Sequence, residues 1–252
     1  MMRFDIESVR ARLPGRDVYW FETIGSTMHE AARLAARDAV SGTTVGAEEQ
    51  TAGLGRHGHT WHSEREAGLY VSVVLRPPLP PDSLPLVTLT LGLAASEAIS
   101  QASGLACDLR WPNDVLTGGK KCAGILVQFE QPAVVAGIGI NVNQTAFPAD
   151  IAMLATSLRI ASGGPHSRED LLVRLLESID AHCRILAEQG KEAILQSFTY
   201  ASSFVSGRRV IVDQGHETLE GVTEGLDESG FLLLRRPDGK RSLILAGGVR
   251  PA

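Results

Sequence analysis

Residues 84–103 form an almost continuous apolar segment, and this segment constrains the fold more than any other part of the chain. A helix that is apolar on all sides cannot lie on a protein surface, so it has to be buried against other elements. The longest uninterrupted apolar stretches, such as residues 86–95, fall well short of the roughly 20 residues that cross a bilayer. We therefore expect a helix over residues 84–103 that packs against a sheet in a soluble globular protein.

Segments rich in β-branched and aromatic residues surround this helix and predict strands. They lie at residues 17–24, 43–48, 69–75, 109–111, 122–130 and 134–141. Tight turns join the later strands, most clearly at Gly118-Gly119, so these strands are expected to be antiparallel. Helices are predicted for residues 4–13, from a capping box at Thr27 and Glu30 to Gly42, from a cap at Ser167 and Asp170 onward, and for residues 191–204. The fold class is α+β, with a mixed, largely antiparallel sheet.

The character of the chain changes after Ser206, where only short strands are predicted. They lie at residues 209–212, 219–225, 231–235 and 242–246, and Gly and Asp residues separate them. About 48 residues of small β barrel or sandwich follow from this pattern. We therefore expect two domains, residues 1–204 and residues 205–252.

Charge and cysteine content exclude several classes of protein. The 24 Lys and Arg residues are spread along the chain against 29 Asp and Glu residues, which gives a net charge of −5, so a nucleic-acid partner is not expected. The three cysteines have neither the spacing of a zinc site nor that of a disulfide framework. Because the N-terminus also lacks the apolar core of a signal peptide, a cytoplasmic location without a membrane partner is expected.

Residues 49–61 contain almost no apolar side chains, yet they include Gly53, Gly55 and Gly58 in the pattern G-x-G-x-x-G. The pattern is weak evidence for a dinucleotide site, because no apolar strand runs into the glycines and no helix follows them. Flexible backbone amides together with Arg56 and the flat Trp61 side chain favour an anion clamp for a phosphate or carboxylate. A solvated surface loop remains the alternative. His57, His59 and His62 lack the additional ligands that a metal site needs.

Residues 110–124 combine turn-forming residues with polar and aromatic side chains. Pro112-Asn113-Asp114 and Gly118-Gly119 are typical of turns, and solvated lysines would complete that simple interpretation. Trp111 and Asn113, however, supply a stacking surface beside a polar side chain. Lys121 leads directly into an apolar strand, a placement that suits a cation positioned toward developing negative charge.

Two further places combine backbone features with polar groups. Gly137 and Gly139 occupy alternate positions of one predicted strand, so one face of that strand is bare and open to a ligand or another chain segment. Asn141 and Asn143 stand at its end, where they are either turn residues or ligand contacts. Ser26 and Thr27 are explained as helix N-cap residues, although a hydroxyl pair also suits a polar ligand.

Four motifs in this order resemble those of the biotin protein ligases. They are GST at residues 25–27, EEQTAGLGRHGHTW at 48–61, RWPNDVLTGGKKCAGIL at 110–126 and GIGINVN at 137–143. The resemblance runs from about Tyr19 to the end of the chain. It implies a class II synthetase-like catalytic domain followed by a small C-terminal SH3-like β barrel.

The resemblance also implies a reaction in two steps. ATP and biotin form biotinyl-5′-AMP and pyrophosphate, and a lysine of a biotin carboxyl carrier domain, such as that of acetyl-CoA carboxylase, then displaces AMP. Lys121 and Arg56 are implied to be catalytic, with Mg²⁺ on the phosphates near Asp114 and Asn141. The implied biotin contacts are Ser26, Thr27, Gln50, Gly53, Gly55, Arg56, Lys121, Gly124, Gly137 and Gly139. The implied nucleotide contacts are Arg56, Trp61, Asn113, Asp114, Lys121 and Asn141.

The sequence departs from the pattern of that family at four positions. Leu54 and His59 stand where arginines are usual, Met28 stands where asparagine is common, and Arg110 replaces a lysine. Since the loop then carries one arginine instead of several, Arg56 is expected to keep the phosphate role while the loop closes more weakly.

Other interpretations remain open at this stage. A lipoate-type ligase would share the chemistry of adenylation, and a nicotinamide-dependent oxidoreductase or a non-catalytic regulator that responds to biotin are more distant alternatives. About 18 residues precede the first predicted strand, so no N-terminal helix-turn-helix domain is expected here. The sequence is compatible with a monomer or a homodimer.

Overall fold

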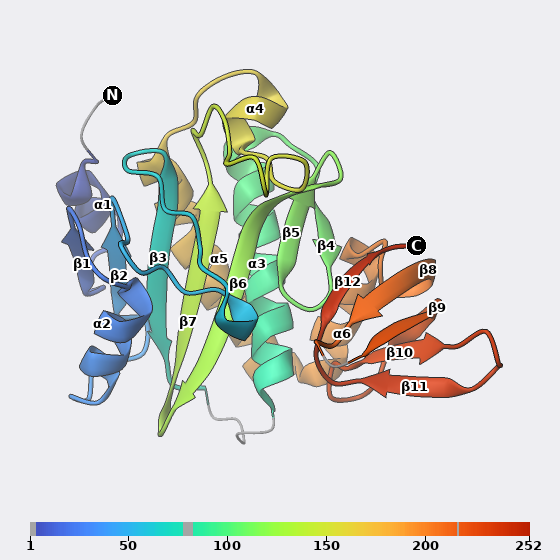
Figure 1. The fold of residues 1–252 in the computed structure, drawn as a ribbon. Helices are drawn as coiled ribbons and strands as arrows, with labels where there is room; N and C mark the ends of the chain where they lie inside the picture. Colours follow the sequence, from blue (N-terminus) through green and yellow to red (C-terminus); the bar gives the residue numbers. More distant parts are fainter. Residues whose placement is uncertain (1–3, 78–82, 216) are drawn as a thin grey trace.

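The computed structural model describes residues 4–77, 83–215 and 217–252, and its main layer is a seven-stranded sheet (Figure 1). The strands lie in the order β1-β2-β3-β7-β6-β5-β4. Only β1 and β2 pair in parallel, which confirms the prediction of a mixed, largely antiparallel sheet. The strands are β1 (Val18–Phe21), β2 (Thr44–Ala47), β3 (Gly68–Leu75), β4 (Asp108–Arg110), β5 (Asp114–Thr117), β6 (Lys120–Glu130) and β7 (Ala133–Asn141).

Helices α3 (Leu84–Ser103) and α5 (Arg168–Gln189) cover one face of this sheet (Figure 1). The apolar pattern of α3 predicted its burial, and Leu89, Leu91 and Ile99 are indeed fully enclosed in the main core. Three shorter helices complete this layer and the periphery, α1 (Ile6–Arg12), α4 (Leu158–Ser162) and α6 (Lys191–Ala201). Within the described part of the chain, no helix has the length and apolar content needed to cross a bilayer.

The opposite face of the sheet carries α2 (Thr27–Ala35) and a smaller apolar cluster. Successive side chains of a strand point to opposite faces, so Val71 and Val73 of β3 join the main core while Val74 joins the cluster beneath α2. Ser72 lies on the same side as Val74, and it faces the N-terminus of α2 through a hydrogen bond to Thr27. This face is therefore only partly covered by apolar packing, and the candidate site lies here.

The C-terminal segment forms a five-stranded antiparallel sheet in the order β11-β10-β9-β8-β12. Its apolar residues, such as Val210 and Leu232, belong to the same core cluster as α3. The buried indole of Trp111 also donates a hydrogen bond to the carbonyl of Gly230, at 2.9 Å. The strands are β8 (Ser206–Asp213), β9 (Thr218–Leu226), β10 (Leu232–Arg235), β11 (Arg241–Ile244) and β12 (Gly248–Pro251).

The prediction for α2 was wrong at its C-terminal end. The helix ends at Ala35 instead of Gly42, because Asp38 takes a left-handed φ of 59° and the Ala39 amide donates back to the Leu34 carbonyl at 3.1 Å. The Arg76 side chain also donates hydrogen bonds to the carbonyls of Ala35 and Ala39, both at 3.0 Å. At the other end Ser26 is the N-cap residue, and its side chain makes no capping hydrogen bond. The predicted capping box at Thr27 is therefore absent.

Three short elements were not predicted: β5, α4 and β12. The four residues of β5 pair with both β4 and β6, but turn-forming residues flank them on each side and mask the strand. Helix α4 has five residues, too few to show a period. Strand β12 contains Gly248 and Pro251 and lies at a sheet edge, where proline is tolerated.

Candidate active site

A pocket with an empty volume of about 460 Å³ lies on the α2 side of the large sheet. Its walls come from α2, from the loop of residues 49–67, which we call the active-site loop, and from strands β3, β6 and β7. Segments far apart in the sequence thus converge on one place. The pocket brings together these predicted site residues: Thr27, Gln50, Gly55, Arg56, Trp61, Asn113, Lys121, Gly124, Gly137 and Gly139.

One part of the pocket is a connected set of hydroxyl and amide groups. The Gln50 Oε1 atom accepts hydrogen bonds from the Thr27 amide at 2.9 Å and the Thr27 hydroxyl at 3.0 Å. The Thr27 hydroxyl also contacts the Ser72 hydroxyl at 2.8 Å, and Gln50 Nε2 donates to Ser63. Ser26, the residue before Thr27, is also buried, and its hydroxyl has no hydrogen-bond partner in the described residues, but it does not line the pocket. The polar set of Thr27, Gln50, Ser63 and Ser72 suits a compact polar ligand group.

The sheet floor of the pocket consists of glycines, as the alternating pattern predicted. A Cβ atom on Gly137 would lie 2.6 Å from the Met28 sulfur, and one on Gly139 would lie 2.4 Å from the Trp61 ring. A Cβ atom on Gly124 would also approach Trp61, to 2.9 Å. The glycines therefore make room for Met28 and Trp61 against the sheet. Trp61 covers the floor that had been assigned to the biotin ring, and its Nε1 atom has no hydrogen-bond partner in the described chain.

Lys121 and Arg110 hold the carboxylate of Asp114 from two sides. The Lys121 Nζ atom lies 2.6 Å from Oδ1, and the Arg110 guanidinium lies 2.7 Å from Oδ2. Burial by itself raises the pKa of Asp114, but the two cations outweigh it and lower this pKa below its usual range. The carboxylate therefore stays charged at neutral pH, and the stability that it contributes is lost only when the pH falls below that range.

The Arg56 side chain extends from the active-site loop and joins it to Asn113 and to the segment before β12. Its Nη1 atom donates to the Asn113 side chain at 3.0 Å and to the Gly247 carbonyl at 3.3 Å. Burial lowers the pKa of Arg56, and the charge of Asp114 partly opposes that shift. The Asn113 amide in turn donates to the Ile125 carbonyl of β6 at 2.9 Å, so its orientation is fixed.

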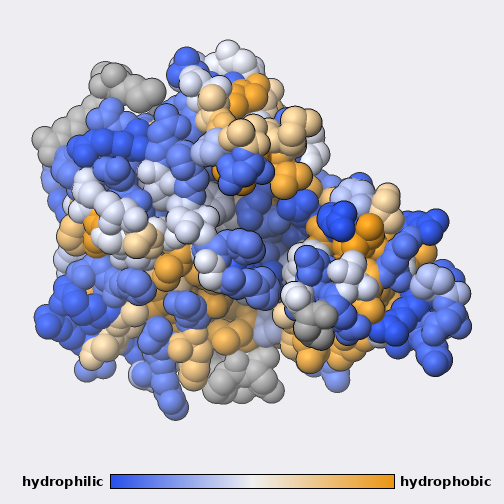
Figure 2. Space-filling view, viewed as in Figure 1, coloured by the Kyte–Doolittle hydropathy of each residue, from blue (hydrophilic) through white to orange (hydrophobic). Residues whose placement is uncertain are grey.

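A second, more open hollow of about 990 Å³ adjoins the first. Gly55, Arg56, Trp61, Asn113 and Lys121 line both. On its far side the second hollow is lined by the C-terminal sheet, by residues 213–215 and 247–248. Figure 2 shows this region as a depression with largely hydrophilic walls between the main body and the C-terminal strands. The two hollows meet beside Arg56 and Lys121, and the Trp61 ring lies over the glycine floor of the first.

The active-site loop folds back on itself where it crosses the pocket. A short 3-10 turn, η1 (Arg56–Gly58), lies between the two arms of the loop. Backbone hydrogen bonds join these arms, from the Gly55 amide to the His59 carbonyl and from the Trp61 amide to the Gly53 carbonyl. Side chains at Gly53 and Gly55 would lie within 2.9 Å of backbone oxygens, which explains both glycines. Within residues 4–77, 83–215 and 217–252, no group of three or more His, Cys, Asp or Glu residues has the arrangement of a metal site.

Asn141 lies outside both hollows, although it was grouped with the nucleotide contacts. Its side-chain amide donates to the Thr156 carbonyl at 3.1 Å, and neither hollow includes it in its lining. Asn143 similarly donates to the His166 carbonyl and accepts from the His166 amide. Both residues fasten the segment that follows β7 to the end of the strand.

Comparison with known proteins agrees with this geometry. The Biotin/lipoate A/B protein ligase family matches residues 20–144, and the Biotin protein ligase C terminal domain matches residues 205–249. The chain is 34% identical to the bifunctional ligase/repressor BirA of Bacillus spizizenii, over 94% of this chain and 75% of that protein. It is 32% identical to the biotin–[acetyl-CoA-carboxylase] ligase of Mycobacterium tuberculosis, over 97% and 94% of the two chains.

This chain belongs to the biotin protein ligase family. A crystal structure of the biotin protein ligase from Aquifex aeolicus, in complex with biotin and ATP, matches the fold with a TM-score of 0.83 and 31% identity. The match covers 94% of this chain and 99% of that one. The expectation of a class II synthetase-like catalytic domain with a small C-terminal β domain is therefore confirmed at the level of the fold.

Three contributors to this biotin ligase site were missed in the sequence. Ser72 is a single polar residue in an otherwise apolar strand, and its position on the Thr27 side could have identified it. Gly247 takes part through its backbone carbonyl, which no sequence pattern indicates. Met28 was noted only as a departure from the family, yet it fills the space above Gly137.

Proposed function

We propose that this chain joins biotin to the AMP part of ATP, with release of pyrophosphate, and then transfers the biotinyl group to a lysine of a biotin carboxyl carrier domain. One observation carries the proposal: the first pocket and the second hollow meet at Arg56 and Lys121. Biotin in the first and ATP in the second would bring the biotin carboxylate and the α-phosphate together between two cations. The carrier domain is suggested by relatives from Mycobacterium tuberculosis and Paracoccus denitrificans, which are named biotin–[acetyl-CoA-carboxylase] ligases.

In the first step, an oxygen of the biotin carboxylate attacks the α-phosphorus of ATP. The new P–O bond forms as the bond to the β-phosphate breaks, and pyrophosphate leaves with the electron pair of that bond. Negative charge gathers on the phosphoryl oxygens, and Lys121 and Arg56 offset it from fixed positions. Asp114 holds the Lys121 ammonium 2.6 Å away, so the cation needs little reorganisation when ATP binds.

In the second step, the neutral amine of the acceptor lysine attacks the acyl carbon of biotinyl-5′-AMP. The C–N bond forms, the C–O bond to AMP breaks, and the amine loses a proton. The adenylate is a mixed anhydride that water also attacks, so it has to be shielded until the acceptor arrives. Trp61 and the active-site loop, which lie over the pocket floor, are suited to exclude water.

We assign the residues of the first pocket to biotin and those of the second to the nucleotide. Ser26, Thr27 and Gln50 would bind the ureido group, and Gly53 and Gly55 would give backbone access. Gly124, Gly137 and Gly139 would give floor space once the Trp61 ring, which covers Gly124 and Gly139 here, moves away. Trp61, Asn113 and Asp114 would attend the nucleotide, and Asn141 would act through the segment it fastens. Residues 1–204 and 205–252 are proposed as the catalytic and C-terminal domains, with the second contributing to the nucleotide hollow through residues 213–215 and 247–248.

Magnesium is expected to enter with the ATP phosphates. Mg²⁺ binds such sites through substrate phosphates plus one or two carboxylates. Here the nearest predicted ligand, Asp114, already has an ion pair on each oxygen. The residues as they lie do not form a magnesium site on their own, so we derive no step through the metal.

Release of pyrophosphate tests the proposal and separates it from the lipoate-type alternative. The purified chain with ATP should release pyrophosphate when biotin is added and not when lipoate is added, because the hydroxyl and amide groups around Thr27 and Gln50 suit a ureido group. A coupled phosphate assay measures this directly. Dependence on lipoate, or on neither acid, would exclude the proposed function.

A further inference from the structure

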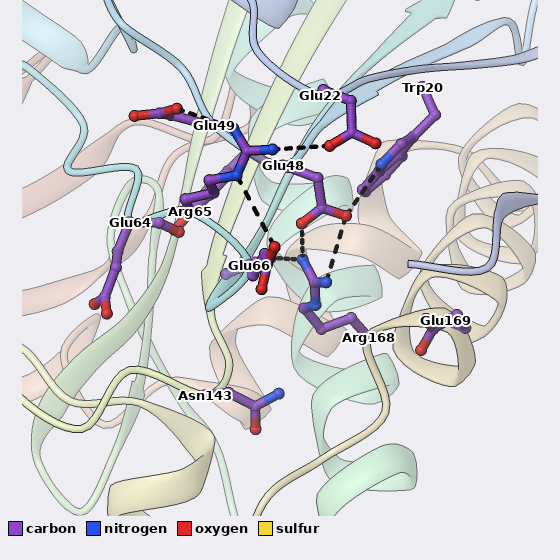
Figure 3. Close-up of polar contacts among 12 residues, drawn as sticks. Trp20, Glu22, Glu48, Glu49, Glu64, Arg65, Glu66, Asn143, Arg168 and Glu169 are labelled. Carbon is purple, nitrogen blue, oxygen red and sulfur yellow. Dashed lines mark hydrogen bonds and ion pairs between the residues drawn. The ribbon is translucent and has the colours of Figure 1, made fainter. Parts of the chain in front are cut away.

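We propose that Arg168 is a positioning residue, which clamps the two ends of the active-site loop together from the opposite face of the sheet. This inference rests on the proposed function, since the purpose of the clamp is to hold the loop over biotinyl-5′-AMP. None of the site motifs contains Arg168. It is the first residue of α5, and it reaches the loop from behind the sheet (Figure 3).

The clamp is formed by contacts of one guanidinium group with both flanks of the loop. Arg168 Nη1 lies 2.7 Å from Oε2 of Glu48, the residue immediately before the loop. The same nitrogen donates to the carbonyl of Gly68, the residue immediately after the loop, at 3.3 Å. Arg168 Nη2 donates to Glu48 Oε1 at 3.4 Å. This one side chain thereby joins the entry and the exit of the loop, in addition to the backbone hydrogen bond from the Glu66 amide to the Glu48 carbonyl at 3.4 Å. Figure 3 shows its contacts with Glu48.

The clamp is buried, unlike the other arginine of this region. The side chains of Glu48 and Arg168 are only 2% and 5% exposed. Trp20 Nε1 donates to Glu48 Oε1 at 3.2 Å, and the ring of Phe4 lies 5.3 Å from the Arg168 guanidinium carbon, so both ions are shielded from water. Arg65 also contacts several carboxylates, including that of Glu22 (Figure 3). Its side chain is 48% exposed, however, and solvent-exposed ion pairs contribute little stability.

The fixed ends connect directly to the residues that face biotin. Gln50 follows Glu48 by two positions, and its side chain holds Thr27. At the other end the Ala67 carbonyl accepts a hydrogen bond from the Asn143 amide at 2.6 Å, and the Tyr70 hydroxyl donates to the Glu64 carbonyl at 2.8 Å. Loss of the clamp would loosen both ends at once, while the tip would keep the hydrogen bonds of Arg56 to Asn113 and Gly247.

Two variants separate the clamp from the stability of the fold. Arg168→Lys keeps the charge opposite Glu48 but offers one nitrogen in place of the two-armed guanidinium. The double variant Glu48→Gln/Arg168→Met removes both buried charges, and an apolar replacement of a buried ion pair often folds as well as the parent. Arg12→Gln is the matched control, because Arg12 pairs with Asp170 in the same first turn of α5 without contact to the loop.

The readouts are amide hydrogen exchange over residues 49–67 and the fraction of adenylate that escapes. We expect exchange near both ends of the loop to rise at least fivefold in the two variants. Free biotinyl-5′-AMP released per biotin transferred should rise at least threefold, whereas Arg12→Gln should match the parent. This ratio does not depend on how much of the protein is folded, so loss of stability alone would not change it.

The outcomes distinguish failure of the clamp from failure of the function. Parent-like exchange and retention in the double variant, at parent-like thermal stability, would overturn the clamp. Failure of both variants to fold would also overturn it, because Arg168 would then be an ordinary core residue. A parent that forms no biotinyl-5′-AMP would exclude the proposed function, while the exchange measurement would still decide whether Arg168 holds the loop ends.

Discussion

Lys120 and Lys121 are neighbours in the sequence with different surroundings in the fold. Lys121 faces Asp114 and lies 5.4 Å from the centre of the Trp61 ring, whereas the Lys120 ammonium points toward the Ala152 carbonyl. Because neighbouring side chains of a strand point to opposite faces, one lysine belongs to the pocket and the other does not. The sequence analysis placed Lys121 immediately before the strand predicted for residues 122–130, whereas β6 begins at Lys120.

We predict that Lys121→Ala abolishes biotin-dependent pyrophosphate exchange while the protein remains folded. A positioned cation that faces developing charge contributes about 3–4 kcal/mol to the transition state, so the loss should be at least about a hundredfold. Lys120→Ala should retain nearly the rate of the parent. Isotope exchange measures the rates and circular dichroism the fold. A folded Lys121→Ala protein with nearly normal exchange would exclude the assignment.

The cysteines show what residue spacing does not reveal. Cys107 and Cys122 are 15 positions apart and show no paired spacing, but the fold places the Cys122 thiol close enough to influence the pKa of Cys107. The hydrogen bond from Cys122 lowers the pKa of the Cys107 thiol to about 7, while burial raises that of Cys183 to about 11. Only the pairing of β5 with β4 and β6 creates this contact, and β5 was not predicted.

Cys107 should therefore be the first cysteine to react as the pH rises. The thiolate is the nucleophile, so alkylation of Cys107 should increase through a midpoint near pH 7, and Cys183 should stay unmodified at that pH. Cys122→Ala removes the donor and should move the midpoint upward, toward about 8.5. Iodoacetamide labelling followed by mass spectrometry measures each site. An unchanged midpoint in Cys122→Ala would show that Cys122 does not cause the shift.

At the scale of elements, long patterns predicted structure well and short ones did not. The apolar run of α3 predicted the bounds found in the fold, because a helix that is apolar on all sides has to be buried in the core. The alternate glycines of β7 correctly indicated a bare face. The end of α2 was predicted at Gly42, but the helix ends before Asp38, whose left-handed φ of 59° no apolar period reveals.

The active-site loop is the element whose conformation should change with the ligand. Its tip is held by hydrogen bonds within the loop and by Arg56, which reaches Asn113 and Gly247. We predict that Arg56→Gly releases free biotinyl-5′-AMP that labels lysines of bystander proteins, whereas the parent retains it. Since Leu54 packs against the apolar cluster beneath α2, it should support closure in place of the usual arginine.

Amide hydrogen exchange across residues 51–64 measures the closure. A non-hydrolysable adenylate analogue should slow exchange in the parent, because the free backbone of a glycine-rich loop keeps a large entropy that the ligand removes. Arg56→Gly should show a smaller effect. Equal protection of the parent with and without the analogue would mean that the loop is preformed and does not gate the site.

At the scale of the whole molecule, the sequence predicted two sheets but not how they cooperate. The change of character after Ser206 indicated a separate β domain, and the five-stranded sheet begins there. What it could not show is that residues 213–215 and 247–248 line the second hollow, or that Arg56 donates a hydrogen bond to the Gly247 carbonyl. The Gly247 contact uses a backbone carbonyl, and the type of a residue does not indicate where its carbonyl lies in the fold.

The measurement that tests the central claim most directly is transfer of labelled biotin to a carrier domain. The full chain is incubated with labelled biotin, ATP and a biotin carboxyl carrier domain, beside a carrier whose acceptor lysine is replaced by arginine. We predict label on the intact carrier only when ATP is present, and none on the arginine form. Absence of label on the intact carrier, or equal labelling of both carriers by the parent chain, would contradict the account.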